Sequence, residues 1–398
     1  MAEVTGEDLP PGAAEDLMLS RRAELLHKVG ALLGNSFLLV VTSASAIAVL
    51  FIFYFIGVNG LPFFWSGLES LGGVLDRVGE FFGSIKWHPT ETPLSFGALS
   101  LFIGSVMVTL GAIVVAVPLG VSAAICLSDV LPFSVRQAVK PVIEILAAIP
   151  SVAYGFFALV VFAPVLNEHG GALLETLMWV VGAPIGALCA VVAGDIVTSW
   201  VPEAKTRAFA RVVAMIVLAG VTFGLLWILG GYLRNLPFIR GVNALNASLI
   251  LAVMALPTVV SVSEDALQAV GRELREGSYA LGATRAETMM RVVVPAASSG
   301  ICAAVILGVM RAVGETMAVW MAAGNALQPP SEWFNYLKPY RTLTATIAAE
   351  MGETDQLSAA LHYRSLFALG FCLLVFCFVC NLISEWAVTR TRKKLQGE

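Results

Sequence analysis

The sequence predicts an all-α membrane protein, a polytopic bundle of transmembrane helices. Of its 398 residues, 58% are hydrophobic and only 13% are charged, whereas a soluble domain carries about 25% charged residues. The mean hydropathy is +0.84. Several continuous apolar runs reach the roughly 20 residues that a helix needs to cross a bilayer. A transmembrane β-barrel is excluded, because it would require short segments of alternating polarity.

The apolar runs and the distribution of basic residues together predict a topology. An even number of spans places both termini on one side of the membrane. If that side is the cytosol, sixteen of the 24 Lys and Arg residues lie inside, seven lie outside and Arg311 lies within a span, as the positive-inside rule requires. We expect eight spans, at about 37–58, 98–127, 139–163, 174–197, 209–231, 245–263, 294–324 and 364–388.

The N-terminal part divides into a tail and a first span with its outer loop. Residues 1–36 are expected to form a cytosolic tail, since residues 1–20 hold five acids and no base. A removable signal peptide is not expected, because the first apolar run begins only near Phe37 and is of full length. Residues 37–96 hold the first transmembrane helix and an outer amphipathic loop. The loop is expected to lie at the membrane surface or against other spans, with partner docking as the alternative. Its apolar stripe is Leu68, Leu71, Leu75, Val78, Phe82 and Ile85.

The fourth and fifth spans each carry two glycines four residues apart, Gly182 with Gly186 and Gly220 with Gly224. Small residues at this spacing let two helices approach closely, so these spans are expected to pack as a hairpin. The six cysteines lie in apolar runs and are interpreted as small buried hydrophobic residues. The four histidines are scattered along the chain, so neither a metal site nor another cofactor is expected.

The cytosolic loop 264–295 carries charges of both signs between two long apolar segments. Its pattern predicts a short helix, a turn at Gly282 and a second helix, which together would form a rigid knob. Pro295 falls near the start of the next span, where its missing N–H costs least. The alternative is an ordinary solvated loop.

The seventh span places Arg311 and Glu315 inside an apolar stretch from Ala296 to Ala326. Each intramembrane charge costs about 2.5–3.5 kcal/mol on insertion and indicates a functional site. The i, i+4 spacing predicts that both side chains lie on one helix face. Arginine can bind an oxyanion through two parallel hydrogen bonds, and Thr316 adds a hydroxyl donor. The alternative is a buried ion pair that only fixes helix packing.

Two absences narrow the functional class. The sequence contains no G-x-x-x-x-G-K-[ST] phosphate loop, so we do not expect the chain itself to bind ATP. No His/Asp/Glu cluster or Ser/His pairing on facing spans supports an intramembrane enzyme. The sequence therefore gives no support for an enzyme.

The cytosolic loop resembles the ATPase-contacting loop of ABC importer permeases. These permeases carry E-A-A, three residues, G, nine residues and I-x-L-P, and this chain carries E-G-S, three residues, G, nine residues and V-V-V-P over 276–295. The two alanines of the family are replaced by Gly277 and Ser278. The resemblance implies a coupling helix that docks on the ATPase, with contacts from Glu276, Gly277, Ser278, Leu281, Gly282 and Pro295.

The seventh span resembles the PstC-type permeases of phosphate-specific ABC transporters. The shared sequence is R-A-V-G-E-T-M-A-V over 311–319, followed by Gly324-Asn325. Other matching segments are V-P-L-G at 117–120, A-I-P-S-V-A-Y-G at 148–155, A-L-P-T at 255–258 and T-L-T-A-T-I-A at 342–348.

This resemblance covers about 97–163 and 245–390 and fails between about 165 and 240. It implies a type I ABC importer core over 97–390 with an extra two-helix insertion at 165–240, followed by a cytosolic tail at 391–398.

The resemblance implies an ATP-driven inorganic phosphate importer of the bacterial inner membrane, with both termini in the cytosol. This chain would be one permease subunit, and Arg311, Glu315 and Thr316 would lie on the substrate path. The implied partners are ATP-binding cassette ATPase subunits, a second PstA-like permease, a periplasmic or extracellular phosphate-binding protein and membrane lipids, with no nucleic acid. The alternatives are a permease for another oxyanion and a secondary transporter that works without ATPase partners.

Overall fold

The computed structural model describes residues 21–65, 71–90, 93–198, 204–326, 334–354 and 361–396. It divides into two compact units, Met1–Asn59 and Gly60–Glu398. In the first unit, α2 (Arg21–Gly60) is a single long helix that holds the predicted first span. The helix begins at Arg21, inside the segment that was expected to be tail, and residues 1–20 lie outside the described part of the chain. Its apolar side chains are exposed, as expected for a helix surrounded by lipid.

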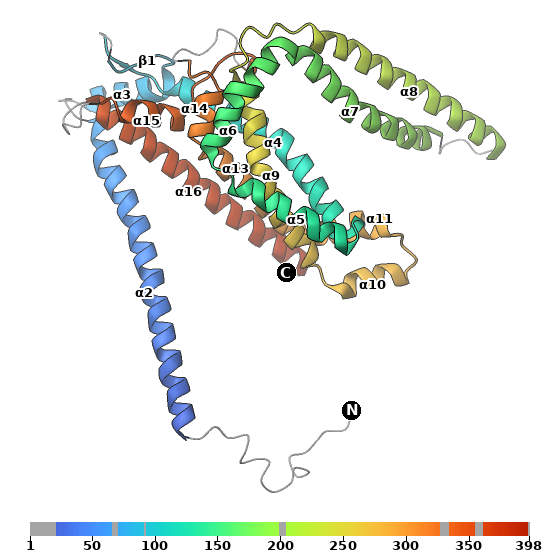
Figure 1. The fold of residues 1–398 in the computed structure, drawn as a ribbon, viewed down its shortest axis with the longest axis horizontal. Helices are drawn as coiled ribbons and strands as arrows, with labels where there is room; N and C mark the ends of the chain where they lie inside the picture. The colour runs from blue at the N-terminus through green and yellow to red at the C-terminus, as the bar shows by residue number, and fades with distance from the viewer. Residues whose placement is uncertain are drawn as a thin grey trace. The chain divides into compact units, whose positions relative to one another are not determined.

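The second unit is built around α9 (Ala244–Gln268), which packs against α4 (Leu99–Ile125) and α13 (Ser298–Val313) (Figure 1). In turn, α13 packs against α16 (Leu361–Gln396). Of the described candidate spans, α9 is the most buried, with 61% of its apolar window inside the protein. The bundle core therefore lies along α9.

Glycines bring the neighbouring helices close to α9. A Cβ at Gly120 of α4 or at Gly308 of α13 would lie 2.7 Å from a methyl group of Val259. A Cβ at Gly300 of α13 would lie 2.3 Å from the Cβ of Ala266. Real Cβ atoms do not approach each other so closely, so these positions have no room for a side chain. This is the small-residue packing that membrane helices use in place of a hydrophobic driving force.

The loop after the first span forms α3 (Leu71–Gly83), and the residues that follow pair in a short antiparallel ladder of β1 (Trp87–His88) and β2 (Ser95–Phe96). The predicted helix is thus present. Leu75 and Phe82 are exposed, whereas Phe81 is fully buried. Phe81 packs with aromatic rings from η1 (Leu61–Phe64) and the β ladder, which could not be seen in the helix's own periodicity. Leu68 lies outside the described residues.

The predicted third span, 139–163, is not one helix. The chain forms α5 (Phe133–Ala148), then takes an extended conformation at Ile149 and Pro150 before α6 (Ser151–Phe157) begins. The extended conformation before a proline is the usual steric outcome, and it ends the first helix. From Ser151 the chain then stays helical through η3 (Ala158–Phe162) and α7 (Ala163–Thr198). The predicted third and fourth spans are therefore joined where a break was expected.

Six described helices are long and apolar enough to cross a membrane, where the sequence predicted eight spans. A seventh is obtained if the bent pair Arg285–Ala296 and Ser298–Val313, at 69°, is counted as one span. The number of spans is lower than predicted partly because the predicted third span is divided between α5 and α6. In addition, α6 continues without interruption into α7, which holds the predicted fourth span. The all-α polytopic fold class is confirmed.

The predicted helical hairpin is formed by α7 and α8 (Ala204–Arg234), which lie side by side in Figure 1. Gly182 and Gly186 face Leu226 and Thr222 of α8, as expected for a close contact. The second glycine pair does not line this contact, since a Cβ at Gly220 or Gly224 would have no atom within 4 Å.

Close packing on α9 predicts that Gly300→Leu destabilises the protein, because the new side chain would displace Ala266 or the backbone of α13. Overpacking of this kind costs about 1–3 kcal/mol. We expect a lower Tm for the detergent-purified variant than for the wild type, measured by intrinsic fluorescence.

The matched control is Gly220→Leu, which makes the same change in a helix where nothing lies within 4 Å. Its Tm should stay near that of the wild type. Equal Tm values for the two variants would contradict the packing role of Gly300.

Candidate functional site

The loop 264–295 has the local structure that the sequence predicted. A short helix, α10 (Arg272–Ala280), ends at Gly282, whose φ of +84° is the left-handed conformation that favours glycine. The N–H groups of Gly282 and Ala283 donate to the carbonyls of Tyr279 and Ser278, which closes the end of the helix. A second helix, α11 (Arg285–Thr288), follows directly.

The second helix begins with a capping box. The Thr284 hydroxyl accepts from the Glu287 N–H, and the Glu287 carboxylate accepts from both the N–H and the hydroxyl of Thr284 at 2.9 Å. The hydrogen bonds from the backbone and side chain of Thr284 hold the pKa of Glu287 below its ordinary value. Both ends of the Gly282 turn are thus fixed by local hydrogen bonds, and the loop is the rigid knob that was expected.

The predicted coupling residues fall into two groups. Glu276, Gly277 and Gly282 are exposed, and the Leu281 side chain is 90% exposed. The Ser278 hydroxyl instead lies 2.8 Å from the Thr288 hydroxyl and joins α10 to α11. The exposed group is therefore available to a partner, whereas Ser278 stabilises the knob itself.

Pro295 lies in α12 (Val294–Ala296), a single turn that follows η4 (Met289–Val293). The long span predicted to start here bends by 69° between α12 and α13. Proline is placed in the first turn of α12, where its missing N–H is not needed.

The knob is anchored to the ends of α4 and α9. Arg275 of α10 donates to the carboxylate of Asp129, which lies in η2 (Cys126–Val130), the π-helical end of α4. It also donates to the carbonyl of Leu267 in α9 at 2.8 Å. A small apolar cluster supports this junction and consists of Ala124, Leu267, Met289, Val293 and Ala297. The pairing of Arg275 with Asp129 could not be predicted from the sequence, because the two residues lie 146 positions apart.

A second ionic contact ties α5 to α9. Lys140 lies 3.3 Å from the Glu264 carboxylate and 3.6 Å from that of Asp265. Glu264 is only 1% exposed and also accepts from Gln268 at 2.7 Å. A buried carboxylate needs such partners. This contact fixes α5 beside the end of α9.

The predicted seventh span is broken between Arg311 and Glu315. The helix α13 ends at Val313, and α14 (Met317–Ala322) starts after Thr316. The two charged residues therefore do not share a continuous helix face, which corrects the i, i+4 prediction. Gly314 caps the C-terminal end of α13. It lies within a long apolar run, and hydropathy alone does not reveal that the helix is interrupted there.

Arg311 and Glu315 make no ion pair with each other in the described part of the chain. Arg311 is exposed in the last turn of α13. Glu315 is partly buried beside a small cavity whose other polar residues are Ser105, Thr109 and Thr342. The Thr316 hydroxyl lies 3.5 Å from the Gly314 carbonyl.

The break is covered by a segment that leads into α15 (Leu343–Met351). The Thr344 hydroxyl donates to the Glu315 carbonyl at 2.8 Å, and the Tyr340 N–H donates to the Ala323 carbonyl at 2.9 Å. These contacts occupy carbonyls that the interrupted helix leaves without their usual donors.

A buried charged cluster lies at the other end of this segment. Glu350 of α15 accepts from Arg341 at 3.0 Å and from the Trp87 indole at 3.0 Å, and it lies 2.9 Å from the His362 ring nitrogen. Burial alone raises the pKa of Glu350, but hydrogen bonds from His362 and Trp87 and the Arg341 charge hold it below its ordinary value. Sequence reasoning missed this cluster, because its members come from four separate segments.

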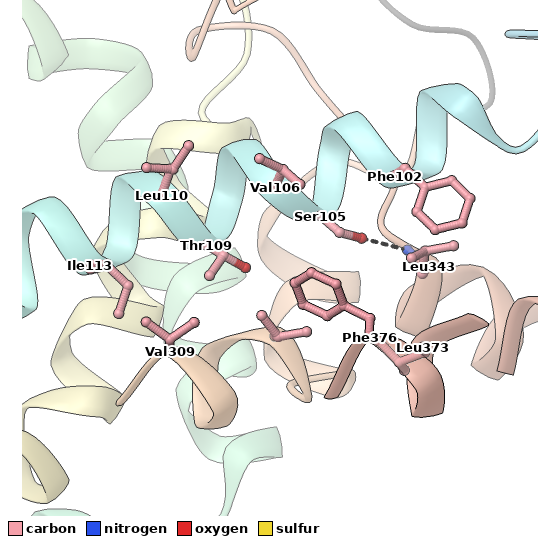
Figure 2. A pocket seen from close by; sticks show the side chains of 11 residues that line it. Phe102, Ser105, Val106, Thr109, Leu110, Ile113, Val309, Leu343, Leu373 and Phe376 are labelled. Atoms are coloured by element: carbon pink, nitrogen blue, oxygen red, sulfur yellow. Dashed lines mark hydrogen bonds between the residues drawn. The ribbon is translucent and has the colours of Figure 1, made fainter. Parts of the chain in front are cut away.

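An adjoining apolar cavity of about 210 Å³, which shares Ser105 and Thr109 with the cavity beside Glu315, lies between α4, α13, α15 and α16 (Figure 2). In Figure 2 its polar groups are Ser105 and Thr109, and Ser105 is occupied in accepting the Leu343 N–H at 2.9 Å. No charged residue lines this cavity. It therefore lacks the groups that would bind an anion.

Comparison with known proteins places these features in a family. The model of the binding-protein-dependent transport system inner membrane component matches residues 116–393. The probable ABC transporter permease protein YqgH of Bacillus subtilis is 30% identical, over 95% of this chain and 96% of its own length.

Two phosphate permeases are similar to this chain at the same level of sequence identity. The phosphate transport system permease protein PstC of Mesorhizobium japonicum is 30% identical over 88% of both chains. PstC of Pasteurella multocida is also 30% identical, over 81% of this chain and 84% of its own. The chain therefore belongs to the binding-protein-dependent inner membrane transport components, among the PstC-type permeases of ABC transporters.

Proposed function

We propose that this chain is an inner-membrane permease subunit of an ATP-driven importer of inorganic phosphate. The observation that carries the proposal is Arg311, an exposed arginine at the end of α13 without a carboxylate partner among the described residues. A guanidinium without a carboxylate partner in an apolar, membrane-spanning stretch is costly unless an anion or water reaches it. Phosphate fits, because its oxygens can accept two parallel hydrogen bonds from one arginine. Relatives named as phosphate permeases support this choice.

The break beside Arg311 suits a substrate path. Non-helical backbone is tolerated at membrane depth where it is buried in protein or lines a water-filled cavity, and interrupted helices form many transporter sites. Glu315 and Thr316 lie in this break. We assign Arg311 to phosphate binding, and Glu315 and Thr316 to the wall of the path.

The exposed face of the knob is proposed to dock on an ATPase subunit. Its outward residues are Glu276, Gly277, Leu281 and Gly282, with Tyr279 half exposed beside them. Because Arg275 joins α10 to both α4 and α9, a movement of the knob would be passed directly to the bundle. Pro295 and the bend after α12 lie between the knob and α13.

The transport cycle that fits this arrangement is alternating access. ATP binding to the partner would favour one orientation of the bundle, provided that the ATPase contacts the two permease states differently. The full complex would contain ATPase subunits, a second PstA-like permease and an outer phosphate-binding protein, embedded in membrane lipid. Both termini are assigned to the cytosol, and the α7–α8 hairpin to an insertion in the importer core.

Two other functions remain to be tested against this one. A permease for another oxyanion would use Arg311 in the same way. A secondary transporter would leave the ordered knob and its exposed leucine without a role.

Arg311→Gln is expected to abolish phosphate uptake, at least tenfold below wild type, while the complex still assembles. Glutamine removes the charge that binds the anion but keeps a polar side chain at the break. Uptake of radiolabelled phosphate by cells and co-purification of the subunits measure the two effects. Uptake at the wild-type rate by the Arg311→Gln variant would contradict the path role of Arg311.

The transported anion is identified separately, by measuring how arsenate, sulfate and unlabelled phosphate compete with uptake in the wild type.

Glu276→Lys is expected to weaken ATPase association, because it reverses a charge on the exposed face of α10. The amount of ATPase that co-purifies and the ATP hydrolysis stimulated by the loaded binding protein should both fall. Glu385→Lys is the control, since it makes the same charge reversal at an exposed position of α16. If equal amounts of ATPase co-purify with the two variants, the proposed docking role of α10 is wrong.

A further inference from the structure

The cluster around Glu350 joins the distant β ladder to three neighbouring segments between Arg341 and His362. Trp87 comes from the β ladder, Arg341 from the segment before α15, Glu350 from α15 and His362 from the start of α16. The Arg341 and Glu350 side chains are 5% and 12% exposed. A carboxylate and a guanidinium so deeply buried must pair. Glu350 therefore fixes where Arg341 lies.

Arg341 in turn belongs to the segment that covers the break beside the proposed phosphate site. Tyr340, the residue before it, binds the Ala323 carbonyl at the end of α14. Thr344, three residues after it, binds the Glu315 carbonyl at the start of the break. The segment thus holds α14 at both ends.

The backbone between these contacts has little freedom. The Arg341 carbonyl lies 2.3 Å from the position of a Cβ on Gly104, so this segment lies directly on α4. The Leu343 N–H donates to Ser105 of α4 at 2.9 Å, and Thr342 caps α15 by accepting from the Ala345 N–H at 3.3 Å. A displacement of Arg341 would therefore be transmitted to Thr344 and would not be absorbed by a flexible loop.

We propose that Glu350 is a positioning residue for transport, which holds the Glu315 break in its working geometry through Arg341 and Thr344. The role rests on the proposed function, because the break is assigned to the substrate path there. Stability alone is a weak reason for such a cluster, since well-packed apolar residues can replace a buried ion pair without loss. Holding a polar break at one position requires directional bonds, which apolar residues do not provide.

The first test uses Thr344, whose replacement leaves the buried charges in place. Thr344→Val removes the hydroxyl at nearly constant volume, and Thr344→Ser keeps it. Thr354→Val is the control, because Thr354 also donates to a backbone carbonyl near the end of α15, that of Met351 at 3.1 Å. Each variant is studied in the complete transporter in proteoliposomes with its binding protein.

We expect Thr344→Val to lower the maximal uptake rate about fivefold, the factor for one neutral hydrogen bond, without changing the KM for the loaded binding protein. Deuterium exchange of residues 314–320 should rise, whereas exchange of residues 250–260 in α9 should not. Thr344→Ser should restore both the maximal uptake rate and the exchange of residues 314–320. Thr354→Val should resemble the wild type in both measurements. Unchanged exchange at 314–320 in Thr344→Val would overturn the proposal.

The second test addresses Glu350 without leaving an unpaired buried charge. The double variant Arg341→Met with Glu350→Gln removes both charges and keeps an acceptor for the Trp87 indole. Faster exchange at 314–320 with a normal amount of assembled complex supports the positioning role, and wild-type exchange contradicts it. Exchange is independent of the solute, so a wild-type complex that fails to carry phosphate would refute the proposed function alone.

Discussion

The close approach of α4 and α13 to α9 is the constraint on which the rest of the bundle depends. Val259 lies between Gly120 and Gly308, and Ala266 lies against Gly300, so three helices meet at positions that have no side chain. Without a hydrophobic driving force between helices in lipid, such contacts supply the packing energy. They also fix the knob and the break relative to each other, because the knob follows α9 and the break follows α13.

The same bundle offers a short physical route between the knob and the break. Arg275 connects α10 to α4 and α9, and the apolar cluster around Met289 connects the knob to α13. From there α13 is one uninterrupted helix to Arg311. Two π-helical segments, η2 and η4, flank the junction. Such segments often mark functional positions in helices, and here both adjoin the knob.

The parts of the structure that the sequence predicted are those set by local rules. The knob was predictable because Gly282 and the pair Thr284 and Glu287 act within a few residues of one another. The presence of helices long and apolar enough to cross a membrane was also predictable, because it follows from local hydropathy. The break at Gly314 could not be predicted, since its compensating donors come from Tyr340 and Thr344. The Glu350 cluster and the burial of Phe81 also depend on residues brought together only by the tertiary fold.

The exposure of Leu281 has a consequence for how the subunits assemble. A leucine that is 90% exposed at the tip of a charged knob gains about 1.5–3 kcal/mol when a partner surface covers it fully. That free energy corresponds to a factor of roughly ten to a hundred in Kd. If the knob docks on an ATPase as proposed, this one side chain would contribute measurably to the affinity of the two subunits.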